Sequence, residues 1–183
     1  AEDLKKYPRD LQKDTSLLEK LGVHFVFAPA PEEMYSKEEM ETAFEFDFNG
    51  LDEVMEGKMR PGHFNGVVQV VSRLFDFIQP TRAYFGEKDF QQLAIIRHMV
   101  ERSSMAERYT GLQIIGCPIV REQSGLAMSS RNERLSSQEK QTAIAISQTL
   151  FSSVEWAKSA TVEEVQQRVI DTINAVQGLE VEY

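Results

Sequence analysis

The fold is decided by the stretch Tyr84-Phe85-Gly86-Glu87-Lys88-Asp89-Phe90-Gln91-Gln92-Leu93. Its apolar start predicts the end of a strand, Gly86 predicts a turn, and the charged residues that follow predict the start of a helix. A helix N-terminus carries unpaired N–H groups and a partial positive charge, and Lys88 adds a cation. The stretch therefore predicts half of a nucleotide site. On local sequence alone, an ordinary strand–turn–helix junction stays open as the simpler interpretation.

Outward from this stretch, apolar segments alternate with helical patterns. Strands are predicted at 24–28, 44–48, 83–85 and 112–117. Helices are predicted at 8–21 before a Gly22 cap, at 51–56 before Gly57, from Val67 to Ile78 with Pro80 as its stop, and from Glu87 to about Arg102. A glycine-rich basic loop is predicted at 58–66. The alternation predicts an α/β fold with a parallel sheet and crossover connections.

The character of the sequence changes after Pro118. A polar connection is predicted at 119–132, followed by two helices that each open with a capping box, at Ser136 and at Thr161. A further strand is predicted to begin at 179–183. We expect a domain boundary near residue 119, with domains at 1–119 and 120–183. Both ends look cut, so we expect an internal piece of a longer enzyme.

Composition excludes several classes of protein. A net charge of −9 and a pI near 4.9 argue against a general nucleic-acid binder. The single Cys117 rules out an internal disulfide and fits a reducing compartment. Three histidines and one cysteine, widely scattered, predict no metal ligands. With no membrane-length apolar run and no signal-like start, we expect a cytoplasmic protein that does not bind membranes.

Two other stretches carry groups that can do chemistry. The loop Arg60-Pro61-Gly62-His63-Phe64 places a guanidinium near an imidazole, and His63 could be a base, a substrate contact or an ordinary loop histidine. In the stretch 125–132, Ser129, Ser130 and Arg131 could wrap a polyphosphate as a closing loop. A solvated linker is the alternative interpretation of that stretch.

Four motifs, in order, make the sequence resemble the pantothenate synthetases, the pantoate–β-alanine ligases. They are Lys6-Tyr7-Pro8-Arg9-Asp10; Arg60-Pro61-Gly62-His63-Phe64; Tyr84 to Asp89 with Gln91-Gln92-Leu93; and Val120-Arg121-Glu122 with Gly125 to Asn132. The resemblance runs along the whole chain and is densest from Arg60 to Asn132. A longer connection at 103–110 departs from the family, and we expect it to be a surface insertion.

The resemblance implies a fold and an activity. The family has a Rossmann-like nucleotidyltransferase domain with a parallel sheet, here partial, and a smaller α+β C-terminal lid domain, here truncated. Its members condense pantoate with β-alanine through a pantoyl adenylate, using ATP accompanied by Mg²⁺ and releasing AMP and pyrophosphate. They are homodimers. This chemistry depends on positioning and charge stabilisation more than on acid–base catalysis.

The resemblance also assigns roles to single residues. The ATP site would be lined by Gly86, Glu87, Lys88, Asp89, Val120, Met128, Ser129, Ser130 and Arg131. Of these, the residues expected to act on the reacting phosphates are Lys88, Ser129, Ser130 and Arg131. Substrate contacts would come from Gln92, Arg60 and His63, with pantoate held by Gln92. No residue is expected to bind a metal ion directly.

The family's His-x-Gly-His motif and a second pantoate-binding glutamine are not among these 183 residues. We therefore expect the isolated chain to be inactive. Two alternatives stay open at this point. One is a related nucleotidyltransferase with another acceptor, and the other is a non-catalytic assembly module that retains the fold.

Overall fold

The computed structural model describes residues 10–42 and 44–183. The chain divides into two compact units after Phe46. In the first unit, α2 (Leu11–Lys20) begins after Asp10, whose carboxylate accepts the N–H of Lys13 at 2.9 Å. The predicted helix is confirmed from Leu11 onward, and Gly22 follows it with φ of 80°. Residues 1–9, with most of the first motif, lie outside the described part. The unit also contains α3 (Pro31–Met34) and α4 (Lys37–Glu41).

The strand predicted at 24–28 is wrong. Residues 23–30 have no regular secondary structure, and Phe25 is 92% exposed. A strand exists only where its N–H and C=O groups pair with a neighbour, and no strand among the described residues pairs with this segment. The apolar run indicated suitability for burial, but periodicity says nothing about which strand will pair with it.

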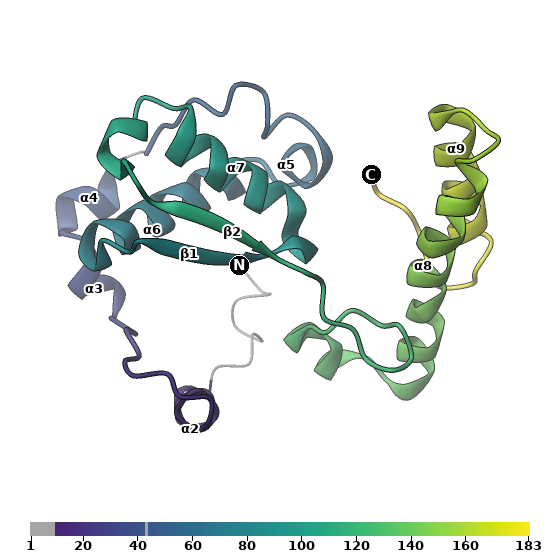
Figure 1. The fold of residues 1–183 in the computed structure, drawn as a ribbon, viewed down its shortest axis with the longest axis horizontal. Coiled ribbons are helices and arrows are strands. Elements are labelled where there is room, and N and C mark those ends of the chain that lie inside the picture. Colours follow the sequence, from purple (N-terminus) through teal and green to yellow (C-terminus); the bar gives the residue numbers. More distant parts are fainter. Residues whose placement is uncertain (1–9, 43) are drawn as a thin grey trace. The chain divides into compact units, whose positions relative to one another are not determined.

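In the second unit, the predicted α/β arrangement with a parallel sheet is confirmed. β1 (Arg82–Gly86) pairs in parallel with β2 (Gln113–Cys117), and Gly86 lies opposite Cys117. The connection between them contains α7 (Phe90–Glu101), which packs on both strands and on α6 (His63–Ile78) (Figure 1). The apolar side chains of these two helices form the centre of the core: Val68, Phe75, Leu93, Ile95, Ile96, Met99 and Val100.

Gly57 does not end a helix as predicted. It is buried inside α5 (Met55–Met59), where a Cβ atom would overlap the backbone of Asp52. Glycine is therefore required for close approach of the chain, not for termination. The predicted loop at 58–66 shrinks accordingly, because α6 begins at His63, directly after Gly62 in the left-handed conformation at φ of 76°.

The strand predicted at 44–48 is also wrong as a strand, although its alternation is real. Phe48 is buried, Phe44 and Phe46 are half-buried, and the acidic residues between them are exposed. No strand of the described chain forms a ladder with this segment. Period-two burial therefore occurs here without strand pairing.

The connection at 103–110 is more than a surface insertion. It contains the short 3₁₀ helix η2 (Ala106–Tyr109), and Tyr109 is buried. The Tyr109 ring meets Phe75 of α6 edge-on, with centroids 5.7 Å apart. The tyrosine at position 109 was the sequence signal for this packing, because a large aromatic side chain favours burial.

The two predicted C-terminal helices are confirmed as α8 (Ser137–Trp156) and α9 (Val162–Asn174), which pack against each other. Both open with the predicted capping boxes, at Ser136 and Thr161. The strand predicted at 179–183 does not form, since these residues enter no ladder in the described structure. The division at residue 119 stays a prediction. Across the described residues, no helix is long and apolar enough to span a membrane.

Candidate nucleotide and substrate site

Both strands end at the same edge of the sheet, because Gly86 is the register partner of Cys117. After Gly86 the chain makes one 3₁₀ turn, η1 (Glu87–Asp89), and α7 then starts at Phe90. The predicted strand–turn–helix order is confirmed, but the helix begins three residues later than predicted. In open parallel α/β sheets, ligands bind beyond the carboxyl ends of the strands. The η1 turn lies at such an edge.

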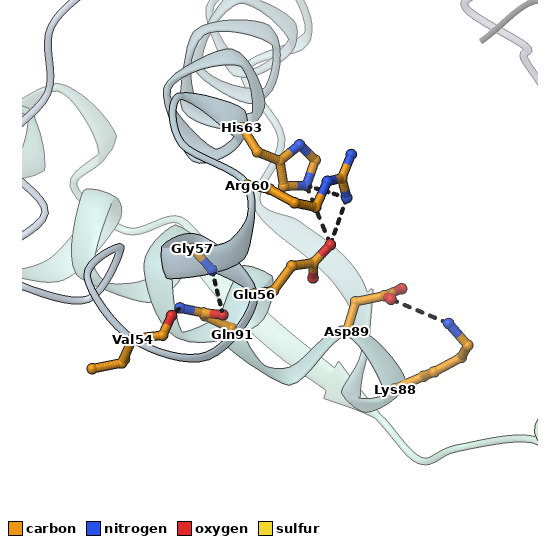
Figure 2. Close-up of polar contacts among 8 residues, drawn as sticks. All are labelled: Val54, Glu56, Gly57, Arg60, His63, Lys88, Asp89 and Gln91. Atoms are coloured by element: carbon orange, nitrogen blue, oxygen red, sulfur yellow. Dashed lines mark hydrogen bonds and ion pairs between the residues drawn. The ribbon is translucent and has the colours of Figure 1, made fainter. Parts of the chain in front are cut away.

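Lys88 and Asp89 point to solvent from this turn. Nζ of Lys88 lies 3.2 Å from Oδ1 of Asp89 (Figure 2). Exposed pairs of this kind contribute little to stability, because water screens the charges. The ammonium group can therefore move to a phosphate at small cost.

Glu87 lies over β2 instead. A Cβ atom at Gly116 would be 3.1 Å from Oε1 of Glu87 and 3.3 Å from a guanidinium nitrogen of Arg97. Gly116 thus leaves space for two charged side chains at the edge of the sheet. The roles predicted for Gly86, Glu87 and Asp89 at ATP stay predictions.

Arg60 and His63, predicted as substrate contacts, do lie together. Figure 2 shows both converging on Glu56 of α5. Oε1 of Glu56 is 2.5 Å from Nη1 of Arg60 and 3.8 Å from Nε2 of His63, and that Arg60 nitrogen is 3.3 Å from the same His63 nitrogen. The turn through Gly62 brings the end of α5 and the start of α6 into this arrangement.

The pKa of His63 lies below its usual value of 6.5. Burial is the main cause, and the positive charge of Arg60 adds to it, while Glu56 opposes the shift and Arg131 gives a smaller lowering contribution. A neutral imidazole has one nitrogen that can accept a hydrogen bond. At neutral pH, His63 can therefore accept a proton or hydrogen bond from a ligand.

Sequence reasoning missed Glu56. The predicted helix at 51–56 ended at Gly57, which hid the i, i+4 relationship between Glu56 and Arg60. Extending the helix through Gly57 to Met59 would have revealed the pair. Glu56 joins the candidate site as the carboxylate that both cationic groups face.

The two adjacent glutamines of α7 differ in their surroundings. Gln91 is 7% exposed, and its Nε2 donates to the carbonyls of Leu51 at 2.7 Å and Val54 at 2.8 Å. The N–H of Gly57 donates to its Oε1 at 3.4 Å (Figure 2). Gln92, the next residue of α7, is half-buried. Its role as a pantoate contact stays a prediction, and the structural role of Gln91 was not foreseen.

Within the connection at 119–132, residues 120–128 form a hairpin. The carbonyl of Val120 accepts the N–H of Met128 at 2.9 Å, and Arg121 bridges to Ala127 in antiparallel fashion. Two residues predicted at ATP, Val120 and Met128, therefore face each other. The guanidinium of Arg121 lies 5.3 Å from the ring centroid of Phe151, which holds the hairpin to α8.

Ser129, Ser130 and Arg131 follow the hairpin directly. Oγ of Ser129 accepts the N–H of Arg131 at 3.3 Å and starts the 3₁₀ helix η3 (Ser130–Arg134). Asn132 donates from Nδ2 to the carbonyl of Ala127 at 2.9 Å, which closes the loop. The loop that was predicted to grip phosphate thus has internal order, and its contact with ATP stays a prediction.

Neither of the two described ranges contains a group of three or more His, Cys, Asp or Glu residues that could hold a metal ion. A Mg²⁺ ion would need most of its oxygen ligands from a phosphate substrate and water, as is usual for Mg²⁺ at nucleotide sites.

By its fold, the chain is an α/β protein of the nucleotidyltransferase type. A pantothenate synthetase from Thermus thermophilus superposes with a TM-score of 0.87 at 40% identity, over 97% of this chain and 62% of that one. A pantoate-beta-alanine ligase from Francisella tularensis, complexed with beta-gamma ATP and beta-alanine, has a TM-score of 0.73 at 32% identity, over 93% of this chain and 61% of that one.

The sequence comparisons agree with the structural ones. The family model for pantoate-beta-alanine ligase matches residues 1–183, so the chain belongs to the pantoate–β-alanine ligase family. The pantothenate synthetase of Phocaeicola vulgatus is 58% identical over 181 residues, which are 99% of this chain and 62% of that relative. The chain therefore spans about three fifths of the length of such relatives.

Proposed function

We propose that the natural protein carrying these residues condenses pantoate with β-alanine at the expense of ATP. One structural observation carries this proposal. Lys88 follows β1, and the Val120 hairpin follows β2, at the edge where both parallel strands end. Nucleotides bind at such edges in α/β folds. Family membership over all 183 residues supports the choice of reaction.

The reaction proceeds in two displacements. The carboxylate of pantoate attacks the α-phosphorus of ATP, the bond to the bridging oxygen breaks, and pyrophosphate leaves. The amine of β-alanine then attacks the acyl carbon of pantoyl adenylate, AMP leaves, and the amine loses a proton. In this proposal, Lys88 and Arg131 stabilise the charge that builds on the phosphate oxygens, and Ser129 and Ser130 donate hydrogen bonds to them.

Pantoate is held by Gln92, with Arg60 and His63 nearby. The support is chemical: a guanidinium can pair with the carboxylate of pantoate, and the lowered pKa of His63 keeps its ring neutral. Oε1 of Glu56 pairs with Arg60 and lies 3.8 Å from Nε2 of His63. Val120 and Met128 complete the proposed nucleotide site on the hairpin.

Mg²⁺ would accompany ATP and neutralise phosphate charge. No cluster of described residues supplies a protein cage for it, so we assign it no protein ligand. We further propose a homodimeric, cytoplasmic enzyme that binds neither nucleic acid nor membranes, with residues 120–183 forming part of a lid domain. Sedimentation and cell fractionation test the first two of these proposals.

Pantoate-dependent exchange of pyrophosphate into ATP by the natural protein tests the proposed function. We expect exchange with pantoate alone and pantothenate only after β-alanine is added. Exchange that requires a different carboxylic acid would instead indicate a nucleotidyltransferase with another acceptor. No exchange with any acid would indicate a non-catalytic module. The same assay on the 183 residues alone tests the expectation that this piece is inactive.

A further inference from the structure

Gln91 joins two elements that are far apart in the sequence. Its side-chain amide reaches from α7 to residues 51–57 through three hydrogen bonds, with donor–acceptor distances of 2.7, 2.8 and 3.4 Å. Nε2 faces two carbonyl oxygens, and Oε1 faces an N–H group. A reversed amide would place Oε1 against two carbonyl oxygens and Nε2 against an N–H group. The hydrogen-bond partners therefore determine its orientation.

The backbone conformation of the segment that Gln91 holds, residues 51–57, is unfavourable by itself. Met55 has φ of 48°, in the left-handed region that residues with a Cβ rarely adopt. Gly57 lies so close to the backbone of Asp52 that no side chain fits there. Backbone of this kind persists only where surrounding contacts determine it. The bonds from Gln91 to Val54 and Gly57 lie on both sides of Met55.

A second side chain of α7 holds the start of the same segment. Nε2 of His98 lies 3.0 Å from the carbonyl oxygen of Asp47. His98 follows Gln91 by seven residues, so both lie on one face of the helix. The segment 47–57 is thus attached to α7 at both of its ends.

We propose that Gln91 is a positioning residue for the substrate half of the site. Glu56 and Arg60 belong to or directly follow the helix that contains Gly57, and Gln92 is the next residue of α7. The amide of Gln91 therefore sets the separation between Arg60 and Gln92. This inference rests on the proposed function only for the identity of the substrate, pantoate.

A measurement on the unmodified natural protein tests the Gln91 clamp, meaning the three hydrogen bonds from the Gln91 side chain to Leu51, Val54 and Gly57. Both Nε2 protons of Gln91 point to carbonyl oxygens in a buried setting, so we expect them to exchange with deuterium far more slowly than the side-chain amide of Gln113. The side chain of Gln113, at the start of β2, is exposed and accepts from Arg82 through its oxygen. Exchange of the Gln91 protons at the rate of Gln113 would overturn the inference.

The variant Gln91→Met tests the positioning role, because it keeps the length of the side chain and removes its polar atoms. We expect faster amide exchange over residues 54–60 and a rise of roughly tenfold to a hundredfold in KM for pantoate, with KM for ATP unchanged. The matched control is Gln113→Met, which should change neither the amide exchange over residues 54–60 nor the KM for pantoate. Equal rises in both KM values would overturn a role confined to the pantoate half.

Gln91→Glu keeps the inference testable if Gln91→Met does not fold. It retains Oε1 and size but replaces the donor with an acceptor, so it should repel the carbonyls of Leu51 and Val54. Faster exchange over 54–60 with an unchanged KM for pantoate would overturn the positioning role. If the unmodified protein makes no pantothenate while the Gln91 protons are protected, the proposed function fails and the clamp stands.

Discussion

Oε1 of Glu56 lies 2.5 Å from Nη1 of Arg60, and the same carboxylate oxygen is 3.8 Å from Nε2 of His63. One carboxylate oxygen thus lies close to both the guanidinium and the imidazole of the candidate substrate site. Its charge raises the pKa of His63 against the larger lowering effects of burial and of Arg60. The pKa of His63 is therefore set by burial and by the charges of Arg60, Glu56 and Arg131.

We expect Glu56→Gln to lower the pKa of His63 further. Removing the negative charge removes the one contribution that favours the imidazolium. NMR titration of the His63 ring measures the shift, and Glu107→Gln in the 103–110 connection serves as the charge-matched control. An unchanged or higher pKa would mean that Glu56 does not act on His63.

His63 should make stability depend on pH. Its pKa in the folded protein lies below 6.5, so the unfolded chain binds more protons between the two values. The free energy of unfolding therefore falls as the pH drops from above 6.5 through the folded pKa. The free energy of unfolding, measured by denaturant titration at several pH values in this range, should change less with pH for His63→Gln than for the unmodified protein.

Lys88→Ala should slow adenylate formation by about a hundredfold to a thousandfold, as loss of a charge-stabilising group does in other enzymes. Its melting temperature should stay the same, because the pair with Asp89 is exposed. Single-turnover assays and thermal unfolding provide the two measurements. Lys158→Ala is the control, because Lys158 also forms an exposed ion pair, with Glu155. Near-normal turnover would remove Lys88 from the site.

Arg131→Ala should weaken the use of ATP, seen as a raised KM for ATP, with little change in stability. The residue is exposed in η3, and its backbone N–H, which remains in alanine, makes the bond to Ser129. Steady-state kinetics and melting curves distinguish the roles. A large drop in melting temperature would favour a structural role instead. Arg82→Ala, at the start of β1, is the matched control.

Two glycines should respond in opposite ways to alanine. Gly57→Ala places a Cβ on the backbone of Asp52, and we expect it to cost about 1–3 kcal/mol of stability. Gly66 lies within α6 with nothing within 4 Å of the position that a Cβ atom would take, so Gly66→Ala should stabilise by about 0.5–1 kcal/mol. Chemical denaturation measures both changes. A neutral Gly57→Ala would contradict the close packing of this turn.

Much of the local structure follows from short-range sequence. The capping boxes at Ser136 and Thr161, the apolar face of α7 and the strands on either side of it were all predictable from neighbouring residues. The failures are non-local. The segment 24–28 is apolar enough for a strand, yet no described strand pairs with it. Propensity and period describe a segment, whereas a ladder needs a partner.

The sequence by itself determined the order of strand, turn and helix around Gly86, the basic and hydroxyl residues of the candidate site, and the likeness to a ligase family. Only the tertiary structure decided that Gln91 is buried against residues 51–57 while Gln92 is half-buried. The physical reason is distance along the chain. Gln91 bonds to residues 34 to 40 positions earlier, and no local pattern encodes such contacts.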